Sequence, residues 1–157
     1  MVILDAKSIK NTYLARQKGY DGGKKISGIK LHIGVDTNGL PHALFVTTAN
    51  VTDRDGAVEM LEIYARYLLS VEKALCDGGY TGEKFAAEVE RVIGAEVEIA
   101  KRSDLRKFAV IPKRWVVERS FSWLENCRRL WKNCERKIRT SLQMSVLAFV
   151  ALLLKRF

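Results

Sequence analysis

The chain has 157 residues, which is enough for one domain with a real core and too few for two comfortable ones. Hydrophobic residues make up 48% of it and charged residues 29%, as is typical of a soluble globular protein. The formal net charge of +9 favours a polyanionic partner, most often nucleic acid. The longest apolar run, MSVLAFVALLL, is too short to span a bilayer, so no membrane partner is expected.

The cysteines and histidines exclude a zinc site. The sequence has three cysteines, Cys76, Cys127 and Cys134, without a C-x-x-C pair, and only two histidines, His32 and His42. No zinc-ligand spacing results. The odd number of cysteines indicates reduced thiols, so we expect a cytoplasmic protein, associated with the nucleoid when active.

The first half of the chain predicts strands. A short apolar run predicts a strand that ends near Asp5, and the polar, glycine-bearing stretch 11–27 predicts a loop. Strand-like runs at 29–35 and 42–49 flank an Asn-Gly pair, which is a strong signal of a β-hairpin. A helix follows, which Thr52 or Asp53 can cap.

The second half alternates between strands and helices and then becomes helical. In chain order, the pattern predicts a strand at 71–76, a helix capped by Thr81 and running to about 93, a strand at 95–100, a loop at 101–113, and helices at 114–132 and 141–155. A hairpin joined to helix-linked strands indicates an α/β class with a mixed five-stranded sheet flanked by helices. The ribonuclease H-like fold has this order of elements.

Two aspartates follow apolar runs at predicted strand ends. Asp5 and Asp77 would converge if their strands are neighbours, because sites in open α/β sheets form outside the carboxyl ends of strands. Carboxylates this close need a cation between them, and hard oxygen ligands suit Mg²⁺ or Mn²⁺. The alternative is that both are turn residues. The glycines after Asp77 favour close approach of a ligand.

Glu118 is ambiguous by periodicity. It falls on the polar side of the predicted helix, where Arg114 stands four residues before it, so a solvated ion pair is one interpretation. The opposite, apolar face holds Val116, Val117, Ser120, Trp123, Leu124, Cys127, Leu130, Trp131 and Cys134.

Several motifs in one order carry a family resemblance. The stretches LDAKSIK, ANVTDRDGA, CDGGYTG and RWVVERSFSWLENCRRLWKNCER stand among them. The chain resembles the catalytic domain of bacterial insertion-sequence transposases of the DDE type, in the group of the IS four and IS five elements. The resemblance implies a ribonuclease H-like fold in which Asp5, Asp77 and Glu118 are the catalytic acids and hold two Mg²⁺ ions.

The chain departs from the family in two respects. Related families often show Y-x2-R-x3-E-x6-K around the glutamate, whereas Ile111 replaces the Tyr and Glu125 the Lys. Family members usually carry an upstream helical segment that recognises the element ends, and here the first acid comes near residue 1. We therefore expect a single DDE catalytic domain over 1–157, without that upstream segment.

A basic stretch predicts contacts with DNA. Nine Lys or Arg residues and three Glu lie between positions 113 and 139, and a second, weaker group comprises Lys24, Lys25 and Lys30. The alternative is a solvated helix face. The residues expected to bind DNA are Lys24, Lys25, Arg114, Arg119, Arg128, Arg129 and Lys132.

The leading hypothesis is therefore DNA transposition by metal-dependent phosphodiester hydrolysis and strand transfer at element ends. The resemblance implies a homodimer on the terminal repeats and the target DNA. One alternative is an inactive DNA-binding fragment or regulator derived from a transposase. Another is a ribonuclease H-like nuclease that acts on hybrids, a type that uses further acids which the strand at 29–35 lacks.

Overall fold

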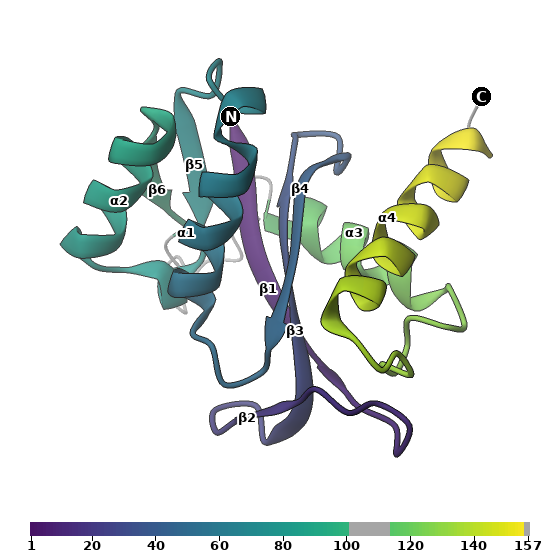
Figure 1. Ribbon diagram of the computed structural model, residues 1–157. Helices are drawn as coiled ribbons and strands as arrows, with labels where there is room; N and C mark the ends of the chain where they lie inside the picture. The colour runs from purple at the N-terminus through teal and green to yellow at the C-terminus, as the bar shows by residue number, and fades with distance from the viewer. Residues whose placement is uncertain (101–113, 156–157) are drawn as a thin grey trace, which may run out of the picture.

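The computed structural model describes residues 1–100 and 114–155 (Figure 1). Six strands form one mixed sheet. In chain order they are β1 (Val2–Lys10), β2 (Gly19–Asp21), β3 (Ile26–Val35), β4 (Pro41–Thr48), β5 (Lys73–Cys76) and β6 (Glu96–Ile99). The helices are α1 (Asp53–Tyr64), α2 (Glu83–Ile93), α3 (Arg114–Glu125) and α4 (Ile138–Leu154), with short 3₁₀ helices η1 (Ala65–Tyr67) and η2 (Gly78–Tyr80).

The sheet joins an antiparallel half to a parallel half at β1. Strands β4, β3 and β1 pair antiparallel, and β1, β5 and β6 pair parallel. The predicted mixed sheet is confirmed, and its five predicted strands are all present. The sixth strand, β2, lies within the stretch 11–27 that was predicted to be a loop. It pairs with only the first residues of β3, so it is too short to show an alternating pattern.

Strand β1 does not end near Asp5 as predicted. It continues to Lys10, because β3 pairs with it along that whole length, as far as Lys10 opposite Gly28. A Cβ atom at Gly28 would lie 2.0 Å from the carbonyl oxygen of Ile9, so only glycine allows this close approach of the two backbones.

Helix caps follow the sequence in one case and differ in the other. Thr52 caps α1, as predicted, with its hydroxyl oxygen accepting from the backbone N–H of Asp55 at 3.1 Å. The cap of α2 is Gly82, with φ of 145°, and not Thr81. The Thr81 hydroxyl donates to the carbonyl oxygen of Gly78 at 2.9 Å and thus closes the preceding turn instead.

Helix α3 ends at Glu125, seven residues before the predicted position. Asn133 holds the following segment away from the helix axis: its backbone N–H donates to Lys10 O at 3.0 Å, and its O accepts from Thr12 N at 2.8 Å. Side chains after Glu125 therefore do not continue the predicted apolar face, and Trp131 is 65% exposed. Helix α4 begins at Ile138, three residues earlier than predicted.

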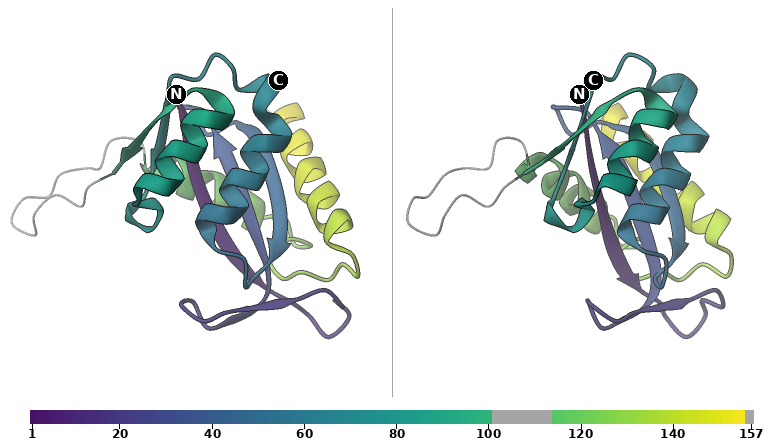
Figure 2. Two further views of the ribbon diagram at one scale, coloured as in Figure 1. Left: turned by 60° about the vertical axis from the view of Figure 1, so that its left-hand side comes forward. Right: turned by 90° about the vertical axis from the view of Figure 1, so that its left-hand side faces the viewer.

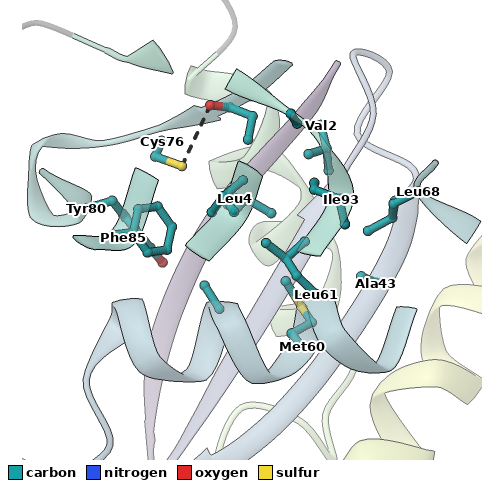
Figure 3. Close-up of a cluster of buried hydrophobic side chains, with 14 residues drawn as sticks. Val2, Leu4, Ala43, Met60, Leu61, Leu68, Cys76, Tyr80, Phe85 and Ile93 are labelled. Atoms are coloured by element: carbon teal, nitrogen blue, oxygen red, sulfur yellow. Dashed lines mark hydrogen bonds between the residues drawn. The ribbon is translucent and has the colours of Figure 1, made fainter. Parts of the chain in front are cut away.

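Two helical layers cover the two faces of the sheet (Figures 1 and 2). Helices α1 and α2 pack on one face around a cluster of buried side chains that includes Leu4, Leu61, Tyr80 and Phe85 (Figure 3). Helices α3 and α4 pack on the other face through side chains such as Phe121. Burial of these side chains in two layers stabilises the sheet that carries the aspartates.

Candidate active site

The aspartates at positions 5 and 77 lie level with each other on neighbouring strands. In the parallel pair of β1 and β5, Ile3 lies opposite Leu75. Each aspartate stands two residues beyond its member of that pair, and Asp5, which lies inside β1, points to the same face of the sheet as Ile3. Both line one small cavity, together with Val117 of α3.

The edge at which these acids meet is formed by the end of β5. That strand ends at Cys76, so Asp77 leaves the sheet, whereas Asp5 remains inside β1 and paired with Ile33 of β3. The convergence predicted from strand ends is therefore present, although only one of the two strands ends there.

Asp77 is shaped by a tight turn as well. Its Oδ1 accepts from the backbone N–H of Gly79 at 2.9 Å, which is the turn role considered from the sequence. A Cβ atom at Gly79 would lie 3.1 Å from that oxygen, whereas one at Gly78 would meet nothing within 4 Å. The missing side chain at Gly79 thus leaves space for the Asp77 carboxylate, whereas Gly78 faces open space.

Buried groups beside these acids carry raised pKa values. Burial raises the pKa of the Cys76 thiol to about 12, and the negative charges of Asp77 and Asp5 add to the effect. Burial likewise raises the pKa of Tyr80 well above its usual value, with Asp5 the next largest cause. The Tyr80 hydroxyl has no hydrogen-bond partner among the described residues. The two carboxylates thus place negative charge beside these buried groups, and a bound cation would offset it.

The carboxylate pair suits a hard divalent cation. Mg²⁺ takes one or two protein carboxylates in octahedral sites and completes its shell with water and phosphate oxygens. Within residues 1–100 and 114–155, no group of three or more His, Cys, Asp or Glu side chains is placed to hold a metal ion. Asp5 and Asp77 therefore offer two of the carboxylates that such a site would use, and Glu118 does not form a group of three with them in this structure.

Glu118 lies on the exposed side of α3, next in sequence to a residue of the same cavity. Val116, Val117 and Leu124 are buried against the sheet and Ser122 is exposed, so the predicted faces are confirmed for these residues; Phe121, which the prediction did not place on the apolar face, is buried as well. The Val117 side chain lines the cavity of the aspartates. The following residue, Glu118, is therefore beside that cavity and open to solvent.

Arg119 is held by the protein itself. Its guanidinium lies between the rings of Trp115 and Trp123, at 4.6 and 5.0 Å from their centres, and donates to Asn38 O at 2.8 Å. Ser120 donates to Gly39 O at 2.8 Å. These contacts fasten α3 to the turn between β3 and β4.

The second basic group divides in the structure. Lys30 is 4% exposed, with Nζ 2.7 Å from Asp53 Oδ1 and 3.6 Å from Asp21 Oδ2, so it is a buried structural cation and not an open DNA contact. Lys24 is exposed, and its Nζ donates to Ala6 O at 3.1 Å, beside Asp5. Lys25 is exposed in a turn with φ of 54°.

The remaining predicted DNA contacts lie in the segment between α3 and α4. Arg128, Arg129 and Lys132 are exposed there, and Arg129 Nε donates to Glu135 at 2.7 Å. The side chain of Arg114 and the predicted loop at 101–113 lie outside the described residues.

One arrangement was not accessible from the sequence. Asn11 and Asn133, far apart in the chain, form an isolated parallel bridge, and Ile138 N donates to Gln17 at 2.8 Å. Figure 1 shows the loop after β1 and the segment before α4 beside each other at the lower right. Exposed Arg16 and Lys18 of that loop thereby join the basic residues of the segment between α3 and α4.

A second missed feature is an ion pair between Lys7 of β1 and Glu125 at the end of α3. Because β1 continues to Lys10, period-two alternation places Lys7 on the same face of the sheet as Asp5. Its partner, 118 residues away, has no local signal in the sequence.

The chain is similar to a curated relative in sequence and to solved structures in fold. The chain is 33% identical over 117 residues to the candidate transposase for insertion sequence element IS402 of Burkholderia cepacia, a match that covers 70% of this chain and 55% of that protein. The chain thus spans about half the length of this curated relative.

Two solved structures share the fold. One is the simian T-cell lymphotropic virus intasome in complex with PP2A regulatory subunit B56 gamma, with a TM-score of 0.59, 14% identity, and coverage of 92% of this chain and 45% of the matched chain. The other is the catalytic core domain of BIV integrase, with a TM-score of 0.55, 12% identity, and coverage of 96% and 81%. The predicted ribonuclease H-like fold is thereby confirmed. The family model described as Transposase DDE domain matches residues 1–154, and this chain therefore belongs to the DDE transposase family.

Proposed function

We propose that this chain is the catalytic domain of a DNA transposase, spanning residues 1–157, which cleaves phosphodiester bonds at insertion-sequence ends and transfers the freed strands to target DNA. The observation that carries the proposal is the level placement of Asp5 and Asp77 across the parallel strands β1 and β5, in one cavity with Val117. Membership of the DDE family and the likeness to integrase catalytic cores support it.

Asp5, Asp77 and Glu118 would hold Mg²⁺, or Mn²⁺ in its place, as two ions. When bound, the ions would activate the attacking oxygen and neutralise charge on the phosphate during in-line displacement. The chain itself contributes the position of the acids: the sheet fixes Asp5, the Gly79 turn fixes Asp77, and α3 carries Glu118 next in sequence to Val117, which lines the cavity. Completion of the site requires Glu118 to approach the aspartates when metal and DNA bind.

The DNA would lie across the basic residues beside this cavity. Lys24 is next to the strand that bears Asp5, and Arg128, Arg129 and Lys132 stand on the exposed segment between α3 and α4. Contacts of this type position the phosphate backbone without reading its sequence. Two copies of the chain would act together on paired element ends.

The location in the cell is proposed to be the cytoplasm, at the nucleoid. Within residues 1–100 and 114–155, no helix is long and apolar enough to cross a membrane.

The decisive experiment is cleavage of an element-end DNA duplex with Mg²⁺, using the whole protein in which this domain occurs. The parent protein should cleave at the element end, and Asp77→Asn should lose activity by roughly a hundredfold or more. Asparagine keeps an oxygen for the Gly79 turn, so the variant should fold and bind DNA. Cleavage that persists in Asp77→Asn would refute the proposal, and DNA binding without cleavage by the parent would indicate the inactive regulator instead.

A further inference from the structure

Lys7 is a cation placed beside the aspartates by strand geometry. It follows Asp5 by two residues on β1, so the two side chains share one face of the sheet. Its Nζ is ion-paired with Glu125 at the last residue of α3 and lies 5.9 Å from the centre of the Phe121 ring. A positive charge therefore stands next to the negative cavity, on the side toward the end of β1.

A cavity opens at this cation. Its volume is about 200 Å³, and Lys7, Lys10, Phe121, Glu125 and Trp131 are among its lining residues. Trp131 is 65% exposed, and the ammonium of Lys132 lies 4.7 Å from its ring centre. The cavity thus connects the strand that bears Asp5 with the basic segment that follows α3.

The carboxylate of Glu125 can be replaced as the partner of Lys7 at little cost in stability. The side chains of Lys7 and Glu125 are 37% and 48% exposed, and such pairs contribute little to stability because water screens them and both long side chains lose freedom. Lys30 is the opposite case: its side chain is 5% exposed and lies between Asp53 and Asp21, so loss of its charge would leave two neighbouring carboxylates without their buried cation.

We propose that Lys7 is a phosphate-binding residue for the DNA that enters the site, and that Glu125 holds its ammonium until a phosphate replaces the carboxylate. This inference rests on the proposed function and adds a residue and an exchange step to it. The acids alone repel a polyanion, and a cation two residues along the same strand face offsets that repulsion where the backbone must approach. Replacement of one exposed carboxylate by a phosphate requires no movement of the fold.

The first test is the salt dependence of binding to a duplex that carries the element end, measured by titration in EDTA so that no cleavage occurs. Lys7→Met keeps the aliphatic stem over Phe121 and removes the charge. It should weaken binding and reduce the slope of log affinity against log salt by about 0.9, the value for one lost phosphate contact. Lys7→Arg should restore the slope of the parent, and circular dichroism checks that all variants are folded.

The second test uses the exchange partner. Glu125→Gln releases Lys7 and should tighten binding about two- to fivefold at low salt, since an exposed pair contributes this little. The matched control is Glu98→Gln, which removes the same negative charge and releases Lys73 from a more exposed ion pair between β5 and β6. Glu98→Gln should tighten DNA binding clearly less than Glu125→Gln does. In the Lys7→Met background, Glu125→Gln should give no more tightening than Glu98→Gln does.

The outcomes separate this inference from the proposed function. An unchanged slope in Lys7→Met, or full tightening by Glu125→Gln without Lys7, overturns the role of Lys7. If in that case the parent still cleaves and Asp77→Asn does not, the proposed function stands alone. A parent protein that binds no DNA overturns both.

Discussion

Asp5 and Asp77 lie level with each other across β1 and β5, because the paired residues Ile3 and Leu75 each precede them by two positions. The register of the two strands depends on backbone pairing, and asparagine keeps an oxygen for the turn at Gly79. The chemistry of both acids is therefore testable without loss of the fold.

Asp5→Asn and Asp77→Asn should each abolish Mg²⁺-dependent cleavage of an element-end duplex, and the double variant should be no worse than either single variant. The two acids serve one site, and losses within such a unit do not add. Cleavage rates with the whole protein check this, together with melting temperatures. Additive losses in the double variant would show that the two acids act separately.

Glu118→Gln should also abolish cleavage. The free energy of unfolding should change by only about 0.5 kcal/mol or less, as expected for an exposed helix position. Glu125 is unsuitable as its control because it is paired with Lys7. Glu59, exposed on α1, is a better one, and Glu59→Gln should keep the activity of the parent. If Glu118→Gln cleaves normally, Glu118 is a solvated helix residue and the third acid must be sought elsewhere.

The sequence predicted elements that local patterns encode and missed those that distant contacts create. The Asn38-Gly39 turn is present, with Gly39 at φ of 84°, and the Thr52 cap is present, because each needs only neighbouring residues. The length of β1 depends on its partner β3, and the end of α3 depends on the bonds of Asn133 to the loop after β1. Neither has a local signal.

The same distinction applies to the site. Asp5 and Asp77 were predicted as site residues because apolar runs precede both, and the register of β1 and β5 brings these two positions level with each other. Lys30 was grouped with DNA-binding residues because charge in a sequence does not show burial. Its partners Asp21 and Asp53 come from different elements, which only the folded sheet assembles.

His32 predicts a loss of stability in mild acid. It is fully buried on β3 with its Nε2 3.0 Å from Thr47 Oγ1, and burial, the largest cause, lowers its pKa from 6.5 to about 4. A depressed histidine pKa means that the unfolded chain binds the proton more tightly, so stability is fully present above pH 6.5 and falls from there to pH 4. The loss amounts to roughly 3 kcal/mol.

Urea unfolding between pH 4 and 7 measures this effect. His32→Gln should flatten the dependence of the unfolding free energy on pH in that window. Below this window Asp21 adds a second loss, because its hydrogen bond from Ser8 is the largest cause that lowers its pKa to about 2. A flat profile in the parent between pH 4 and 6.5 contradicts the assignment to His32.

Gly56→Ala should destabilise the protein, although alanine is the better helix former. Gly56 lies in α1 against His32, and a Cβ atom there would lie 2.2 Å from His32 Cε1. We expect a loss of about 1–3 kcal/mol from overpacking, in place of the gain of about 1 kcal/mol that alanine gives in an open helix. Gly22→Ala is the comparison, because a Cβ atom there meets nothing within 4 Å. Thermal unfolding decides between the two signs.

Arg119 and Arg128 were both expected to bind DNA, and the structure predicts that they differ. Arg119 is held between Trp115 and Trp123 and donates to Asn38, so Arg119→Met should lower the unfolding free energy by about 1–3 kcal/mol, because the Asn38 carbonyl loses a charged donor and the rings lose their cation. Its effect on the salt dependence of DNA binding should be small.

Arg128 is exposed, so Arg128→Met should change the unfolding free energy by less than about 0.5 kcal/mol and reduce the slope of log affinity against log salt by about 0.9. Both variants remove one positive charge, and so the general effect of net charge cancels in the comparison. Urea unfolding and salt titrations on the same two proteins measure the four quantities. If Arg119→Met keeps the unfolding free energy of the parent but has a smaller slope of log affinity against log salt, Arg119 contacts DNA and does not serve to hold the turn between β3 and β4.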